Sequence, residues 1–127
     1  MPKTIVVVDD DQDDLDLMRQ AVKEIDPSLY CISFIYPEEA LRVICKQLAK
    51  TPDHIFIDIN MPGMTGDKLL KEIRKQKELD KLIVTLYSTS MPADVAEALR
   101  TNGANYTFEK PVRLRTYVEI MREIIQA

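Results

Sequence analysis

Residues 4–11 read TIVVVDDD, five β-branched residues in a row followed by three aspartates. An unbroken run of this kind is typical of a strand that is buried on both faces. After the aspartates, apolar residues recur at helical spacing at Leu15, Met18, Val22 and Ile25. The stretch therefore predicts a buried strand, an acidic loop and an amphipathic helix, in that order.

Strand-like and helical segments continue to alternate to the end of the chain. Strand-like runs occupy residues 29–36, 55–57, 82–87 and 105–109, of which the last is the most polar. Each is followed by apolar residues at helical spacing. Pro37 opens a helix in which Leu41, Ile44 and Leu48 are expected to face inward, and a helix over residues 66–77 should bury Leu69, Leu70 and Ile73. A further helix begins near Ser90 and Pro92, stops at Asn102-Gly103 and should bury Val95, Ala98 and Leu99. In the last helix the residues expected to face inward are Leu114, Val118, Met121 and Ile125.

Five strand–helix units predict a doubly wound α/β fold. Parallel strands need crossover connections, and right-handed crossovers place helices on both faces of the sheet. The expected strand order is 2-1-3-4-5, the flavodoxin-like (βα)5 arrangement. A length of 127 residues fits one domain. We therefore expect a single domain over residues 1–127, with no effector domain.

The composition excludes several classes of function. The chain is 46% hydrophobic and 30% charged, with a net charge of −4, which gives no basic surface for direct nucleic-acid binding. Its apolar runs are too short to span a membrane, and residues 1–4 lead into the first strand without signal-peptide architecture. The two cysteines, Cys31 and Cys45, form no CxxC pair and are expected to be reduced packing residues. We therefore expect a cytoplasmic location.

Polar side chains follow four of the predicted strands at the edge where such folds bind their ligands. This edge is the carboxyl end of the sheet, at the switch point between strands 1 and 3. The residues concerned are Asp9, Asp10 and Asp11 after the first strand, Asp58 after the third, Ser88, Thr89 and Ser90 after the fourth, and Lys110 with Pro111 after the fifth. The fold thus brings together acids, hydroxyls and one lysine from distant parts of the chain.

Clustered carboxylates of this kind indicate a metal-assisted phosphoryl site. Close carboxylates repel one another and raise each other's pKa unless a cation compensates them. Oxygen ligands suit Mg²⁺, which binds through a few carboxylates and keeps waters that a phosphate can displace. With the ion and Lys110 to neutralise a phosphoryl group and Ser88 to donate a hydrogen bond to it, an aspartate can act as the nucleophile.

Four short strings at these strand ends resemble the receiver domain of two-component response regulators, and the resemblance covers essentially the whole chain. The strings are Val8-Asp9-Asp10-Asp11, Asp58-Ile59-Asn60-Met61-Pro62-Gly63-Met64-Thr65-Gly66, Ser88-Thr89-Ser90 and Lys110-Pro111. The resemblance implies that Asp58 is the phosphoacceptor and that Asp10 and Asp58 bind the metal. It implies that Asp9 binds the ion directly or through water and that the main-chain oxygen of Asn60 adds a ligand. It further implies that Ser88 and Lys110 contact the phosphoryl group and that the Lys110-Pro111 bond is cis.

The resulting expectation is a phosphorylation-controlled switch that takes a phosphoryl group from a sensor histidine kinase or a histidine phosphotransfer protein onto Asp58, as an aspartyl phosphate, with Mg²⁺. It would signal by docking to an unknown protein or by onward phosphorelay, and would be no enzyme beyond autocatalytic phosphotransfer and autodephosphorylation. One alternative is a degenerate receiver that acts as a binding module, although the acids, the nucleophile and the lysine are all present. Another is a small phosphatase of the haloacid dehalogenase type, although Asn60 stands where that family leads us to expect an acid. The chain has no Walker-type loop for nucleotide hydrolysis.

Two groups of residues are expected to lie outside this chemistry. The acids at the start of the first helix should complement its positive end, namely Asp11, Asp13, Asp14 and Asp16. His54, the only histidine, is expected at the edge of a strand without a catalytic role.

Position 107 departs from the family pattern. Receivers usually carry an aromatic residue three positions before the strand 5 lysine, and this chain has Thr107 there. Tyr106 and Phe108 are each one residue away, and one residue along a strand reverses the face. The distance of seven positions from Gly103 to Lys110 matches the usual spacing, which argues against a register slip. We therefore expect the aromatic switch to be absent or altered, with Thr107 packing or hydrogen-bonding where a ring would rotate.

Overall fold

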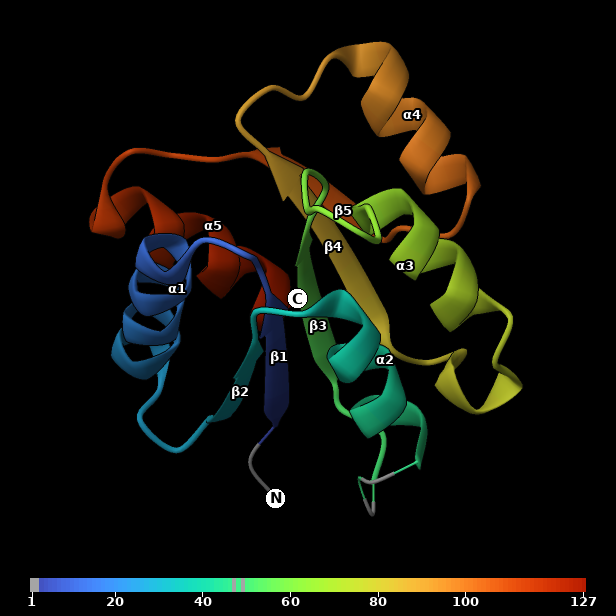
Figure 1. The fold of residues 1–127 in the computed structure, drawn as a ribbon. Helices are drawn as coiled ribbons and strands as arrows, with labels where there is room; N and C mark the ends of the chain where they lie inside the picture. The colour runs from blue at the N-terminus through green and yellow to red at the C-terminus, as the bar shows by residue number, and fades with distance from the viewer. Residues whose placement is uncertain (1–2, 47, 49) are drawn as a thin grey trace.

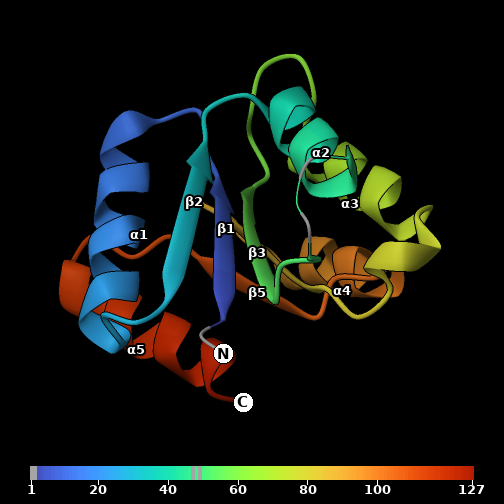
Figure 2. The same cartoon turned by 90° about the horizontal axis from the view of Figure 1, so that it is seen from below.

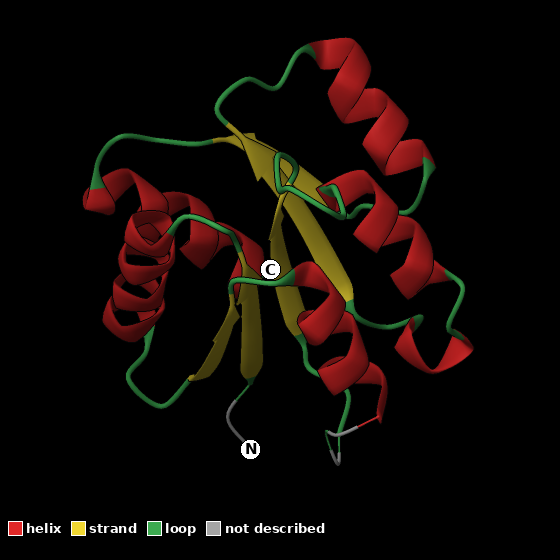
Figure 3. Cartoon of the chain, in the orientation of Figure 1, coloured by secondary structure: helices red, strands yellow, loops and turns green. Residues whose placement is uncertain are grey.

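The computed structural model of the protein describes residues 3–46, 48 and 50–127, which form a layered α/β fold (Figures 1 and 3). The strands are β1 (Thr4–Val8), β2 (Tyr30–Phe34), β3 (His54–Asp58), β4 (Ile83–Ser88) and β5 (Tyr106–Glu109). The helices are α1 (Gln12–Ile25), α2 (Pro37–Lys46), α3 (Gly66–Arg74), the 3₁₀ turn η1 (Lys77–Leu79), α4 (Ala93–Thr101) and α5 (Leu114–Ile125).

The sheet has the predicted topology. Its strands are parallel and lie in the order β2-β1-β3-β4-β5. Helices α1 and α5 cover one face, and α2, α3 and α4 cover the other, as the view from below shows (Figure 2). The doubly wound fold expected from the alternation of strands and helices is therefore confirmed.

The two central strands place the acidic residues. In β1, Ile5 and Val7 belong to the apolar core beneath α1 and α5, and Val6 and Val8 belong to the core beneath α2 and α3. All four side chains are fully buried, because β1 is covered on both faces. The register pairs Val8 with Ile57 of β3, so the residues that follow them, Asp9 and Asp58, lie at the same edge of the sheet.

Helix α3 is shorter than predicted. It ends at Arg74, and Lys77–Leu79 forms the 3₁₀ turn, so the prediction of a helix over residues 66–77 was wrong in its last turn. The guanidinium of Arg74 donates to the carbonyl oxygens of Leu79, Leu82 and Gly103 at 3.1, 3.0 and 2.9 Å. These bonds hold the chain after α3 against the start of β4 and the end of α4.

The inward face of α4 differs from the prediction. Ala96 and Leu99 are buried, whereas Val95 is 38% exposed and Ala98 is exposed. The expectation that Val95 and Ala98 face inward was therefore wrong. Ala96 and Leu99 are three residues apart and share one helical face, a spacing that the sequence offers equally well.

Two smaller predictions about α2 also need correction. Leu48 lies beyond the end of the helix, although it still packs against the core beneath α2 and α3. The Leu48 N–H donates to the Val43 carbonyl at 3.1 Å. This bond spans five residues, whereas the bonds of an α-helix span four. Cys45 is exposed on the outer side of α2 and is not a packing residue, whereas Cys31 is half-buried; both are free thiols.

Among the described residues, no helix combines the length and apolar character needed to cross a bilayer. The start of the chain at residues 1–2 lies outside the described residues.

Candidate functional site

Three carboxylates meet at the carboxyl edge of the sheet. Asp9 and Asp10 follow β1, Asp58 is the last residue of β3, and one oxygen of each lies within 4.8 Å of the other two. Asp9 and Asp58 are buried, with 0% and 3% exposure, and Asp10 is exposed. The cluster is therefore open to solvent at Asp10, and its hard oxygen atoms form a donor set that suits a small divalent cation.

Hydrogen bonds fix the two buried carboxylates. The Oδ1 atom of Asp9 accepts from the backbone N–H of Asp11 at 2.9 Å, and its Oδ2 atom accepts from the hydroxyl of Tyr87 at 2.8 Å. The Oδ1 atom of Asp58 accepts from the backbone N–H of Asn60 at 3.3 Å. The loops that leave β1 and β3 thus orient the acids with their own backbone.

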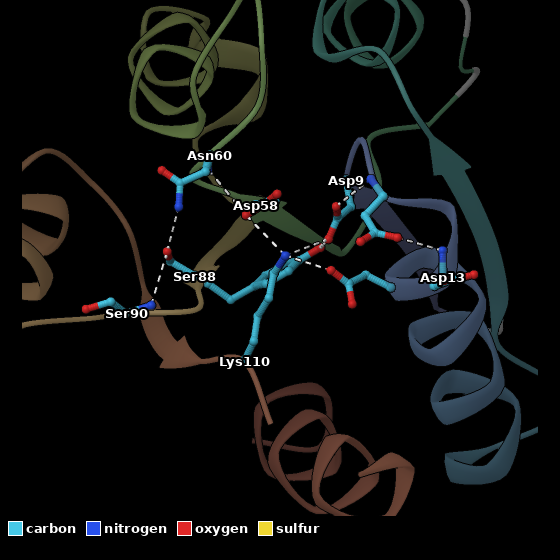
Figure 4. Close-up of polar contacts among 10 residues, drawn as sticks. Asp9, Asp13, Asp58, Asn60, Ser88, Ser90 and Lys110 are labelled. Carbon is cyan, nitrogen blue, oxygen red and sulfur yellow. Dashed lines mark hydrogen bonds and ion pairs between the residues drawn. The ribbon is translucent and has the colours of Figure 1, made fainter. Parts of the chain in front are cut away.

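Lys110 extends from the end of β5 into the acidic cluster (Figure 4). Its Nζ atom lies 2.7 Å from Asp14 Oδ2 and 3.5 Å from both Asp9 Oδ2 and Asp58 Oδ1. Its backbone N–H donates to the Ser88 carbonyl at 2.7 Å, which joins the ends of β4 and β5. The Lys110-Pro111 bond is trans, so the expectation of a cis bond was wrong; trans is the lower-energy isomer of an X–Pro bond by about 0.5–1 kcal/mol.

Ser88 is connected to the loop that carries Asp58. Its hydroxyl is buried at the end of β4 and accepts a hydrogen bond from the side-chain amide of Asn60 at 2.9 Å. The backbone N–H of Ser90 approaches the same oxygen at 3.5 Å (Figure 4). The Ser88 hydroxyl proton is free to point toward a ligand, because the oxygen acts as an acceptor in both contacts.

The loop after Asp58 depends on Gly66. A Cβ atom there would lie 2.5 Å from the Asp58 carbonyl oxygen and 2.7 Å from the Ile59 Cα atom, so only glycine fits. The Gly66 N–H donates to the Ile59 carbonyl at 2.9 Å and closes the loop just as α3 begins. This contact explains why a glycine ends the string that starts at Asp58.

The electrostatics of the site are those of crowded, buried acids. Burial and the neighbouring charge of Asp9 raise the pKa of Asp58 to about 7, although Lys110 opposes the shift. Burial likewise raises the pKa of Asp9, against the hydrogen bonds from Asp11 and Tyr87. Burial alone would lower the pKa of Lys110, but the bond to Asp14 and the charges of Asp9 and Asp58 raise it above its usual value. A cation at this cluster would relieve the repulsion between the acids.

The structure brings all the residues predicted for the site to one edge of the sheet: Asp9, Asp10, Asp58, Asn60, Ser88 and Lys110. Of the acids assigned to the helix end, Asp11 caps α1 by accepting from the Asp13 N–H at 2.9 Å. Asp14 does more than complement the helix, because it is the nearest partner of Lys110. The prediction for Asp14 was therefore too narrow.

Tyr87 is a member of the site that sequence reasoning missed. It reads as an ordinary strand residue, yet it is buried and its hydroxyl bonds to Asp9. A buried tyrosine next to a strand-end hydroxyl is a usable signal, because a buried phenol needs a polar partner. His54, by contrast, is buried at the start of β3, and burial and the charge of Lys3 lower its pKa to about 4.

The pairing of β4 and β5 is continuous. Leu86 pairs with Thr107 and Tyr87 pairs with Phe108, so no register slip moves an aromatic residue to position 107. Phe108 packs in the core beneath α1 and α5, and Tyr106 is 37% exposed. Whether the aromatic switch is absent stays a prediction about the activated protein.

Comparison with known protein sequences points to one family. The sequence profile described as "Response regulator receiver domain" matches residues 5–122. The chain is 27% identical over 112 residues to Stress response regulator protein 1 of Debaryomyces hansenii, a match that covers 87% of this chain and 45% of that protein. The chain spans about half the length of the curated relatives it matches, with 45% and 59% for two of them.

Solved structures share the fold. The phosphorylated cyanobacterial phytochrome response regulator RcpA superposes with a TM-score of 0.87 at 24% identity, over 99% of this chain and 93% of its own. The Mn²⁺-bound form of response regulator Rcp1 superposes with a TM-score of 0.83 at 24% identity, over 97% of this chain and 91% of its own.

Proposed function

The chain belongs to the response regulator receiver domain family, and on that basis we propose that Asp58 is its phosphoacceptor. The observation that supports this assignment is the surroundings of Asp58: a buried carboxylate with two further acids within 4.8 Å and the Lys110 ammonium 3.5 Å away. A phosphoryl group on Asp58 would thus lie between a donor set for a cation and a fixed positive charge. Phosphoryl transfer needs mainly positioning and charge stabilisation, which these groups supply.

The proposed reaction is a displacement at phosphorus. An oxygen of the Asp58 carboxylate attacks the phosphorus of a phosphohistidine, the P–N bond breaks, and the histidine nitrogen keeps the electron pair and is protonated. Asp58 then carries a mixed anhydride. Before phosphorylation and without a cation, the Asp58 carboxyl group has a pKa of about 7, so part of the protein holds Asp58 in its protonated, weakly nucleophilic form near neutral pH.

The acidic residues fit a divalent cation, and we assign Mg²⁺ to the site. Asp9, Asp10, Asp58 and the main-chain oxygen of Asn60 would hold it, with water at the remaining positions. When bound, the ion neutralises negative charge on the phosphoryl oxygens and keeps Asp58 ionised.

Lys110 and Ser88 would contact the transferred group directly. The Lys110 ammonium would donate to one phosphoryl oxygen once Asp14 releases it, and the Ser88 hydroxyl would donate to another. The chain would itself catalyse at most its own phosphorylation and dephosphorylation. Asn60 stands where a haloacid dehalogenase-type phosphatase would carry its second acid, and the degenerate-receiver alternative would require the loss of a group that is present here.

The partners follow from the chemistry of the site. The donor would be a sensor histidine kinase or a histidine phosphotransfer protein, and output would pass by protein docking or onward phosphorelay. We also propose that residues 1–127 act as one receiver domain in the cytoplasm, without direct contact to nucleic acid or membrane.

The test is phosphorylation by a small phosphoramidate, followed by intact mass measurement with Mg²⁺ or with a chelator. One added phosphoryl group that requires Mg²⁺ supports the proposal. Labelling to the same extent in chelator would contradict the metal assignment, and no labelling at any Mg²⁺ concentration would contradict the proposed function.

A further inference from the structure

Tyr87 occupies a central position beneath the acidic cluster. In the sheet register it pairs with Asp58 on one side and with Phe108 on the other. Its side chain is fully buried and belongs to the core beneath α1 and α5. The site therefore rests on an aromatic ring whose polar end reaches one of its acids.

Three contacts hold this side chain in place. Its hydroxyl donates to Asp9 Oδ2 at 2.8 Å. Its ring stacks on Phe108 with the centroids 5.2 Å apart and the planes at 11°, and the Lys110 Nζ atom lies 5.4 Å from its centroid. A ring packed in this way cannot swing aside, so the position of its hydroxyl oxygen is fixed.

The Tyr87 hydroxyl helps to fix the orientation of the Asp9 carboxylate. Oδ1 accepts from Asp11 and Oδ2 accepts from Tyr87, and each carboxylate oxygen can accept a second time. One position on each oxygen therefore stays available for a cation. Without the hydroxyl, the donor remaining near Oδ2 is Lys110 at 3.5 Å, which would compete with a cation for the same oxygen.

We propose that Tyr87 is a positioning residue for the metal site, acting through Asp9: its hydroxyl orients the carboxylate toward the cation and competes with Lys110 for the Asp9 Oδ2 atom. This inference rests on the metal site of the proposed function. Hydrogen bonds that orient metal ligands from outside the coordination shell typically contribute 10- to 100-fold in metal affinity. Because Asp9 is one of several ligands, the lower end of that range is the expected effect.

The variant Tyr87→Phe tests this, because it removes the hydroxyl and keeps the packed ring. The matched control is Tyr117→Phe. Tyr117 is also buried beneath α1 and α5 and meets Phe108 edge-on at 6.4 Å, but its hydroxyl makes no hydrogen bond to Asp9, Asp10 or Asp58. The measurement is the dissociation constant of the unphosphorylated protein for Mg²⁺ by calorimetry and for Mn²⁺ by electron paramagnetic resonance.

Tyr87→Phe should bind Mg²⁺ about tenfold more weakly than the parent, and Tyr117→Phe should bind within twofold of it. In an Asp9→Asn background, adding Tyr87→Phe should change the dissociation constant by less than twofold, because the residue acts through Asp9. A Tyr87→Phe protein that binds as tightly as the parent overturns the inference, as does an undiminished effect in the Asp9→Asn background. A parent that binds no divalent cation overturns both the proposed metal site and the inference.

A measurement on the parent protein covers the case in which Tyr87→Phe does not fold. With tyrosine rings labelled with ¹³C at Cζ, addition of Mg²⁺ should shift the Tyr87 resonance more than that of Tyr106, which lies on the exposed side of β5. A Tyr87 resonance that does not move while Mg²⁺ binds would refute the inference.

Discussion

Replacing Asp58 with asparagine is expected to stabilise the metal-free protein at pH 8. The substitution keeps the shape of the side chain and removes a charge that is buried beside Asp9. The pKa of Asp58 is raised from 3.8 to about 7. At about 1.36 kcal/mol per pKa unit, ionised Asp58 costs the native state up to about 4 kcal/mol at pH 8. Part of this cost is shared with Asp9, so we expect a gain of about 2 kcal/mol in the free energy of unfolding.

The gain depends on pH with a definite sign. The folded pKa of Asp58 lies above the unfolded one, so the native state holds the proton more tightly. The destabilisation is therefore complete above about pH 7 and disappears below about pH 4. At pH 5 only a small part of the span between the unfolded and folded pKa has been passed, so the benefit of Asp58→Asn should be less than half of that at pH 8.

The assay is urea unfolding in chelator at pH 5 and pH 8. Asp16→Asn is the matched control, because Asp16 is an exposed aspartate on α1, and it should stay within about 0.5 kcal/mol of the parent at both pH values. An equal gain at the two pH values, or a loss of stability at pH 8, would refute the view that Asp58 is held in a repulsive, buried site.

Three other substitutions probe the groups around Asp58. Lys110→Ala should allow labelling but remove a charge-assisted contact of roughly 1.5–3 kcal/mol, so the spectral change per phosphorylated molecule should fall; a change per phosphorylated molecule equal to that of the parent would contradict this. Asp14→Asn should lengthen the lifetime of the phosphoryl group about two- to fivefold, because it removes a partner 2.7 Å from Lys110 that is worth about 0.5–1 kcal/mol at this partly exposed position; a shorter lifetime would contradict this. Tyr106→Phe should leave phosphorylation-dependent partner binding within about 0.5 kcal/mol of the parent, and a Tyr106 ring that turns in beneath Ser88 in a phosphorylated structure would show that the switch operates.

The topology could be predicted because strand burial and helical spacing are local signals. The run that ends at Val8 and the short run at residues 55–57 both lie in strands covered on two faces, as expected. The end of α3 could not be predicted, since residues 75–77 favour a helix. The chain leaves the helix there because the Arg74 guanidinium donates hydrogen bonds to carbonyl oxygens of later residues. The inward face of α4 could not be predicted either, because the sequence offers two sets of apolar residues at helical spacing. One set includes Val95 and Ala98, and the other, which is buried, consists of Ala96 and Leu99.

The residues that the sequence places at strand ends could be predicted as a site, because parallel topology brings those ends together. Asp14 and Tyr87 lie outside those positions. Asp14 lies in the first turn of α1, and its role depends on the Lys110 side chain, which extends across the edge of the sheet to reach it. Tyr87 lies within β4, and its role depends on a hydrogen bond to a residue 78 positions away. Both contacts are tertiary, so the sequence indicates at most that a buried Tyr87 needs a polar partner and does not identify that partner.

Locating the phosphoryl group on the chain decides whether Asp58 is the phosphoacceptor. The protein is phosphorylated with a phosphoramidate and Mg²⁺, the acyl phosphate is reduced with borohydride, and peptides are mapped by mass spectrometry. Reduction converts a phosphorylated aspartate to homoserine, so we expect homoserine at position 58 in the parent and no labelling in Asp58→Asn. Homoserine at another aspartate, or labelling that persists in Asp58→Asn, would contradict it.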